Sequence, residues 1–185
     1  MTAATPARSV ASGADVVATL RTATRGRVMT PADDEYDHAR IVVYGGIDPR
    51  PPVIARVADA DDVAAVIRIA AGTGLELAVR GGGHSGAAHS TTDTGIVLDV
   101  RDLTGLEIDP VAKTAWAGTG LSAGDVSTGL AEHGLAIGFG DTGSVGIGGI
   151  TLGGGVGYLV RKHGLTIDSL LAAEIVTADG ARRMI

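Results

Sequence analysis

A short segment after an apolar run carries the residue types best suited to chemistry. It reads Arg80-Gly-Gly-Gly-His-Ser85. Three consecutive glycines have no Cβ, so the backbone can approach a ligand closely and direct successive N–H groups toward one point. A diphosphate is the kind of ligand that such a turn binds. The neutral imidazole of His84, directly after the turn, is also a competent nucleophile.

A second glycine-rich segment follows later in the chain. Half of residues 138–157 are glycine, and Asp141 is the only charged residue among them. So many glycines disfavour an ordinary helix or strand, because glycine loses more backbone freedom on folding than any other residue and has no side chain to pack. We therefore interpret the segment as backbone that is held for contact with a ligand.

A strand–helix–strand pattern positions the first glycine loop. Residues 53–57 and 75–79 are apolar runs typical of buried strands. Between them, the acidic residues 59–62 cap a helix whose apolar residues share one face up to Gly72-Thr-Gly74. The pattern predicts a βαβ unit with the loop at the carboxyl end of a strand, where open α/β sheets bind ligands.

Shorter elements are predicted on both sides of this unit. The sequence indicates helices over residues 12–26 and 30–40, the second because Thr30 is followed by proline and acids, and a helix from Ser122 to His133-Gly134. Strands are predicted over residues 96–100, 106–108, 114–117 and 172–177. Asp179-Gly180 is a hairpin signal, but no strand is predicted after it.

Composition narrows the function classes. The net charge of −6 and a pI of about 5.2 disfavour nucleic acid and anionic membrane surfaces as partners. The chain has no cysteine, so it has neither a disulfide nor a thiolate metal site, and its histidines lack metal-ligand spacing. No secretory signal or membrane-length apolar run is evident, so we expect a cytoplasmic protein with no membrane partner.

Two other motif matches compete with the diphosphate interpretation. Gly118-Thr-Gly-Leu-Ser-Ala123 fits the fingerprint of a nicotinamide dinucleotide-binding domain, with Asp141 where a ribose-binding acid is wanted. Gly138-Phe-Gly-Asp-Thr-Gly143 also matches the pattern, and the two matches are mutually incompatible. Gly143-Ser-Val-Gly146 comes within one residue of a serine-nucleophile motif. The acidic clusters stand at predicted helix starts, where carboxylates commonly serve as caps.

In combination, several motifs resemble one family. The sequence is similar to the FAD domain of the p-cresol methylhydroxylase and vanillyl-alcohol oxidase flavoproteins, in particular to the berberine bridge enzyme-like branch. The similarity extends from about Met29 to the C-terminus, and the motifs occur in the family's order. They are Arg80-Gly-Gly-Gly-His-Ser85, Ile96-Val-Leu-Asp-Val100, Gly146-Ile-Gly-Gly-Ile-Thr-Leu-Gly-Gly-Gly-Val-Gly157, Arg161-Lys-His-Gly-Leu-Thr-Ile-Asp168 and Glu174-Ile-Val-Thr-Ala-Asp-Gly180.

The resemblance implies an α+β fold, a PCMH-type FAD-binding domain of two βα subdomains that hold the cofactor between them. It implies a covalent bond from His84 to the 8α carbon of FAD. Some members add a second link through a cysteine, and Thr142 stands at that place here. The expected cofactor-binding residues are Arg80, Gly81, Gly82, Gly83, His84, Ser85, Thr142, Gly143, Val145, Gly148, Gly149, Gly155 and Ile175.

The resemblance also implies a division of the chain and a reaction. Residues 1–28 are expected to form a tail and a short helix, and residues 29–185 an FAD-binding domain that is truncated before the substrate domain. The implied activity is two-electron oxidation of a small alcohol, sugar, phenol or amine-type substrate, with hydride passing to the flavin and dioxygen accepting the electrons. The catalytic base and substrate residues are expected outside these residues.

Three alternatives remain open at this point. The chain could be a non-catalytic remnant that binds flavin, a nicotinamide dinucleotide-binding domain, or a protein with glycine-rich turns and no cofactor. A completing polypeptide or a second copy of the chain is the expected protein partner.

Overall fold

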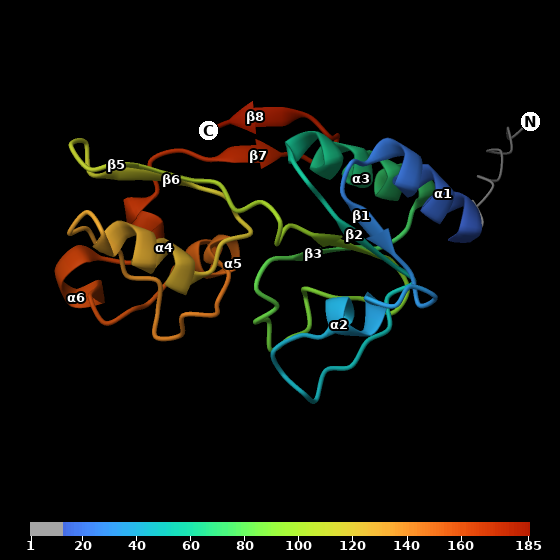
Figure 1. Cartoon of the computed structure of the whole chain (residues 1–185), viewed down its shortest axis with the longest axis horizontal. Helices are drawn as coiled ribbons and strands as arrows, with labels where there is room; N and C mark the ends of the chain where they lie inside the picture. The colour runs from blue at the N-terminus through green and yellow to red at the C-terminus, as the bar shows by residue number, and fades with distance from the viewer. Residues whose placement is uncertain (1–12) are drawn as a thin grey trace, which may run out of the picture.

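A four-stranded sheet organises the first half of the molecule. The structure, a computed structural model, describes residues 13–185 (Figure 1). The strands of this sheet are β1 (Arg27–Met29), β2 (Val53–Arg56), β3 (Leu77–Arg80) and β4 (Ile96–Asp99), in the order β1-β2-β4-β3. β2, β4 and β3 run parallel, and β1 is antiparallel to β2.

The predicted βαβ unit is present, with one difference. β2 and β3 are joined by α3 (Ala60–Thr73), but β4 lies between them in the sheet and pairs with both. All four residues of β4 are buried, as is usual for a central parallel strand. β3 ends at Arg80, so the first glycine loop begins at the carboxyl end of the strand, as predicted.

Helices cover both faces of the sheet. α1 (Gly13–Ala23) and α3 pack together above it, and α2 (Tyr36–Arg40) lies below it (Figure 1). Successive residues of the central strands point to opposite faces, so Leu98 packs with Leu20 and Val66, whereas Val97 packs with Tyr36. This burial on both faces makes the sheet a rigid platform for the loop that follows β3.

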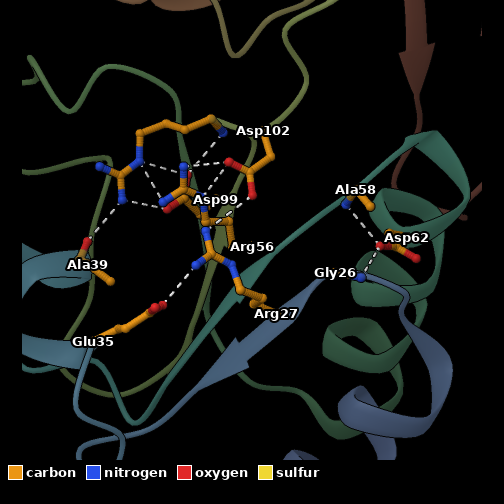
Figure 2. Close-up of polar contacts among 10 residues, drawn as sticks. Gly26, Arg27, Glu35, Ala39, Arg56, Ala58, Asp62, Asp99 and Asp102 are labelled. Carbon is orange, nitrogen blue, oxygen red and sulfur yellow. Dashed lines mark hydrogen bonds and ion pairs between the residues drawn. The ribbon is translucent and has the colours of Figure 1, made fainter.

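Carboxylates at the start of α3 act as structural caps, as predicted. The side chain of Asp59 accepts hydrogen bonds from the backbone N–H groups of Asp61 and Asp62. Asp62 is almost fully buried and accepts from the N–H groups of Arg25, Gly26 and Ala58 at 2.8 to 3.0 Å. Figure 2 shows the contacts with Gly26 and Ala58. Asp62 therefore fixes the turn between α1 and β1 against α3.

The predicted starting residue of the second helix was wrong. The sequence predicts a helix from Thr30, but α2 begins at Tyr36. The carboxylate of Asp33 accepts from both the backbone N–H and the hydroxyl of Thr30, each at 2.8 Å. This local hydrogen bonding favours a turn over a helix start.

The second half is built from short elements around a smaller core. A hairpin of β5 (Leu106–Asp109) and β6 (Thr114–Ala117) is followed by α4 (Ala123–Ala131), α5 (Ile147–Leu152), α6 (Val160–His163) and the 3₁₀ turn η1 (Thr166–Ser169). Leu121, Val126, Leu130, Phe139 and Ile147 form the core. α4 begins as predicted at Ser122, which forms a capping box with Asp125.

Two elements of the second half differ from prediction. The glycine-rich segment contains a helix, α5, where glycine content argued against one. The Asp179-Gly180 turn is followed by β8 (Arg182–Met184), which pairs antiparallel with β7 (Glu174–Val176). Arg182 also forms an exposed ion pair of 2.9 Å with Asp61 of α3, a long-range contact between the hairpin and the first half. The hairpin lies close to α3 (Figure 1).

None of the helices within residues 13–185 combines the length and the apolar character that a membrane crossing requires.

Candidate functional site

The structure brings the two glycine-rich loops into direct backbone contact. A Cβ added to Gly82 would lie well inside 3.0 Å of the backbone nitrogen of Gly146. A Cβ added to Gly146 would lie equally close to the backbone nitrogen of Gly82. Only glycine fits at both positions, because each backbone occupies the space of the other's side chain. The loops that the sequence places sixty residues apart therefore form one surface.

His84 and Ser144 connect the loops through their side chains. The Nε2 atom of His84 lies 3.1 Å from the hydroxyl oxygen of Ser144. Sequence analysis did not name Ser144 as a site residue. The sequence feature that contains Ser144 is Gly143-Ser-Val-Gly146, which was interpreted only as an incomplete serine-nucleophile motif. The contact fixes one imidazole nitrogen and leaves Nδ1 with no hydrogen-bond partner among residues 13–185.

The second loop lies across the start of α4. The N–H groups of Ala123 and Gly124 donate to the carbonyl oxygens of Val145 and Gly143, both at 2.8 Å. The N–H group of Ile147 donates back to Leu121. The second loop is therefore anchored to the core of its own half while its glycine backbone faces the first loop.

These contacts remove the structural basis of the nicotinamide fingerprint. β6, the strand before Gly118, belongs to an antiparallel hairpin and not to a parallel βαβ unit. Glycine is needed at Gly118 and Gly120 because a Cβ there would meet the carbonyl oxygens of Leu103 and Val100 well inside 3.0 Å. The α4 amides that would hold a diphosphate already bond to the second loop.

Arg80 lies beneath the first loop. The residue is only 2% exposed, and its guanidinium donates to the backbone carbonyl oxygens of Ala39 and Ile41. Gly83 adopts a positive φ of 72°, which turns the loop over this group. The carbonyl of Gly83 in turn accepts from the N–H of Val43 at 3.2 Å. The loop is thus supported from below by one buried side chain.

Other predicted residues lie open to a ligand. Outside its chain neighbours and its own helix, no atom lies within 4 Å of a Cβ built on Gly149, and a Cβ on Gly81 meets only the carbonyl of Thr119 at 3.6 Å. Thr142 and Gly143 are exposed, and the Thr142 hydroxyl donates to Asp141 at 3.0 Å. A Cβ on Gly148 would touch the side chain of Thr119 at 3.4 Å. An added Cβ would fit at Gly81, Gly148 and Gly149, whereas at Gly82 it would overlap the backbone of Gly146.

The remaining predicted cofactor-binding residues contact other parts of the chain or lie within their loops. Gly155 is buried with a φ of 75°, and a Cβ on it would overlap the hydroxyl of Thr166 in η1. Its own chain therefore requires glycine at this position, whether or not a ligand approaches. Ile175 lies in β7, half-buried and paired with Arg183. Val145 and Ser85 are half-buried within their loops.

Charged side chains gather at the carboxyl ends of the parallel strands (Figure 2). Asp102 accepts from Arg56 at 2.8 Å and lies 3.5 Å from Arg27, which also pairs with Glu35. The fully buried Asp99 is bonded by Arg101 through both carboxylate oxygens. Within residues 13–185, no cluster of histidine and acidic residues is suited to hold a metal ion.

Comparison with known proteins assigns the chain to a family. The model of the FAD binding domain family matches residues 51–184. The chain is 41% identical over 156 residues to (R)-6-hydroxynicotine oxidase of Paenarthrobacter nicotinovorans, covering 84% of this chain and 34% of that protein. It is 36% identical over 142 residues to berberine bridge enzyme-like 9 of Arabidopsis thaliana, covering 74% and 27% of the two chains.

Solved structures agree with this assignment. The crystal structure of 6-hydroxy-D-nicotine oxidase from Arthrobacter nicotinovorans superposes with a TM-score of 0.85 at 40% identity, over 88% of this chain and 36% of that one. BBE-like 1 of Physcomitrella patens superposes with a TM-score of 0.87 at 29% identity, over 92% and 37%. The chain spans about a third of the length of the curated relatives it matches. It belongs to the FAD binding domain family of the FAD-linked oxidoreductases.

Proposed function

We propose that the chain binds FAD on the surface formed by the two glycine loops. The observation that carries this proposal is the backbone contact of Gly82 with Gly146, which joins the loops into one site. In this proposal, Gly81, Gly82, Gly83 and Ser85 clasp the diphosphate, and Thr142, Gly143, Val145, Gly148 and Gly149 approach the flavin. Gly155 and Ile175 contribute from the second half, where Ile175 supports the adenine end.

The residues present fit a dinucleotide with a diphosphate. Gly81 and Gly149 offer backbone that a side chain of their own would cover, and a buried guanidinium lies beneath the first loop. Aromatic residues make up only 3% of the chain, so the flavin is gripped by backbone and aliphatic groups.

His84 is proposed to bond covalently to the cofactor. The hydrogen bond between the Ser144 hydroxyl and Nε2 engages that nitrogen, which leaves Nδ1 as the nitrogen available to the 8α carbon. The imidazole and the 8α methyl group each lose a proton as the bond forms, and two electrons pass to an acceptor such as dioxygen. Thr142 cannot supply a thioether, so the proposal has a single link.

The bound cofactor supplies two-electron oxidation, and the chain positions and shields it. For the whole protein, we propose oxidation of a small alcohol, sugar, phenol or amine-type substrate with dioxygen as acceptor. One relative is named as a 6-hydroxynicotine oxidase, and the substrate in that name is an amine. A cytoplasmic location is part of the same proposal, and a chain without cysteine is compatible with a reducing compartment.

A completing partner for the chain is also proposed. Large apolar side chains are strongly exposed in the second half: Leu152 is 82%, Val156 69% and Tyr158 87% exposed. Such a concentration of exposed apolar residues is typical of an interface. A further polypeptide segment or a second copy of the chain would cover it. The chain by itself is then expected to show little or no substrate oxidation in a hydrogen peroxide assay over sugars, alcohols, phenols and amines.

The covalent link can be tested directly. The purified chain is acid-precipitated, run on a denaturing gel and inspected for flavin fluorescence. The expected result is a fluorescent band for the natural sequence, none for His84→Ala, and an unchanged band for His133→Ala, an exposed histidine outside both loops. A fluorescent His84→Ala band would exclude His84 as the link. Flavin that is lost on denaturation of the natural chain would leave only noncovalent binding.

A further inference from the structure

Arg80 is a buried cation without a direct acidic partner. Its Nη atoms bond to two neutral carbonyl oxygens, and its Nε atom has no hydrogen-bond partner within the described part of the chain. No carboxylate of residues 13–185 lies within ion-pair distance of it. Burying a charge is costly unless something compensates it, so this arrangement calls for an explanation.

The neighbouring acid does not neutralise Arg80. The sheet register places Asp99 of β4 beside Arg80 of β3, but both oxygens of Asp99 bond to Arg101. The three side chains together carry one excess positive charge. Burial, together with the nearby Arg101, lowers the pKa of Arg80 to about 10. That value is still well above neutral pH, so the guanidinium keeps its charge in the folded protein.

The excess charge lies directly under the first glycine loop. A Cβ on Gly83 would lie 3.6 Å from the Nε atom of Arg80 and 3.8 Å from one of its Nη atoms. Gly83 and the backbone of residues 39–43 therefore separate the guanidinium from the outer surface of the loop. An anion on the outside of this loop would interact with the charge through a thin layer of backbone, where water screens it poorly.

We propose that Arg80 is an electrostatic and positioning residue for the diphosphate of FAD and does not itself touch the cofactor. Its charge attracts the diphosphate through the loop. Its bonds to Ala39 and Ile41 hold the segment whose Val43 N–H fixes Gly83. This inference rests on the proposed FAD site and specifies how one of its residues acts.

The test compares a ligand with phosphates to one without. FAD and riboflavin are titrated into the His84→Ala chain, in which binding is reversible, and into His84→Ala with Arg80→Met or Arg80→Lys. Arg80→Met is expected to weaken FAD binding on the order of ten- to a hundredfold and riboflavin binding far less. Arg80→Lys keeps the charge and should retain most of the preference for FAD.

Salt dependence gives a second readout that a merely structural role would not change. The decrease of FAD affinity with added salt should be shallower in Arg80→Met than in its parent, because one charge interaction is missing. Arg50→Met is the matched control. Arg50 is an exposed arginine of the same half, 61% accessible, and its loss should change neither the ligand preference nor the salt slope.

Each outcome separates this inference from the proposed function. If the His84→Ala parent is folded and binds no FAD, the FAD site itself is wrong. If the parent binds FAD and Arg80→Met weakens FAD and riboflavin by the same factor with an unchanged salt slope, Arg80 has only a structural role. Should Arg80→Met fail to fold, Arg80→Lys decides, because a loss of its preference for FAD would contradict the role of the charge.

Discussion

The two halves of the molecule are held together in different ways. In the first half, side chains on both faces of a parallel sheet pack against helices, with Leu20, Ile54 and Leu98 almost completely buried. In the second half, strands occur only in pairs, and large side chains such as Leu152 and Tyr158 are exposed. The first half is built around a two-sided sheet core, whereas the second half has strongly exposed large apolar side chains near its short helices.

The first half and the junction between the halves should also differ in which substitutions they tolerate. The first half depends on particular side chains, including buried carboxylates that bond to backbone. The contact between the halves depends on the absence of side chains, because Gly82 and Gly146 meet backbone to backbone. Substitutions that add atoms should therefore damage the junction, and substitutions that remove polar atoms should damage the first half.

The largest effect is expected at the junction. Gly82→Val places a branched side chain against the backbone nitrogen of Gly146 and the carbonyl of Ser144. We expect loss of flavin binding and a decrease of about 3 kcal/mol in the free energy of unfolding. Urea denaturation and flavin content measure both. Gly105→Val, where nothing lies within 4 Å of the added Cβ, is the control and should be close to neutral.

A Gly82→Val chain as stable as its parent would show that the loops separate without cost, and the contrast between the halves would fail.

Removal of Asp62 should be the next most damaging change. Asp62→Ala leaves the backbone N–H groups of Arg25, Gly26 and Ala58 without their acceptor in a buried place. We expect a decrease of about 2 to 3 kcal/mol in the free energy of unfolding, measured by urea denaturation. Asp61→Ala, which removes an exposed carboxylate on the same helix turn, should cost much less. Equal effects of the two variants would refute the role of buried carboxylates.

Capping of α3 should give a smaller, pH-dependent effect. Hydrogen bonds from backbone N–H groups, that of Asp62 above all, and the nearby Arg25 hold the pKa of Asp59 below its ordinary value. Asp59→Ala should cost about 1 kcal/mol at neutral pH. Because the folded-state pKa is lowered, this contribution is present above the pKa of the unfolded chain and is lost as pH falls through the folded-state pKa.

Stability curves at neutral and acidic pH test this, with Asp59→Asn as a control that keeps the capping oxygen but does not titrate. A difference between Asp59→Ala and the parent that persisted unchanged in acid would contradict the assignment.

The smallest change in stability is expected on the exposed face of the second half. Leu152→Ser and Tyr158→Ser remove little buried area, so the free energy of unfolding should change by less than about 0.5 kcal/mol. Self-association of the chain, followed by sedimentation, should decrease. Val57→Ser, in the buried core of the first half, should instead destabilise strongly. Unchanged association in the two surface variants would mean that these side chains are not part of an interface.

Local signals were enough to predict much of the fold and some of the site. The strand before the first glycine loop and the cap at Asp59 each depend on neighbours in sequence, and both were predicted correctly. The expected burial of that strand was wrong in part, because β3 is an edge strand and Val79 is 55% exposed. The position of β4 between β2 and β3 and the pairing of β8 with β7 depend on contacts between distant residues. Sequence periodicity carries no information about such contacts, so these features were missed.

The glycines show how far the candidate site could be predicted from the sequence. Glycine content alone predicts that backbone approaches something, but it does not reveal what. At Gly155 the neighbour is Thr166 of the same chain, and at Gly82 it is Gly146, whereas Gly149 faces open space. Ser144 was missed for a related reason, since its importance comes from His84, which lies near it only in the folded chain.

Gly149 therefore offers the most direct test of the central claim that the two glycine loops form an FAD site. The natural chain and Gly149→Val are purified with excess FAD, and the flavin content is measured from visible absorbance, with circular dichroism and Tm as folding controls. We predict flavin in the natural chain and its marked loss in Gly149→Val at a nearly unchanged Tm, because a Cβ added there meets no protein atom outside its own helix. A natural chain that is folded but free of flavin, or a Gly149→Val chain that retains it fully, would contradict the claim.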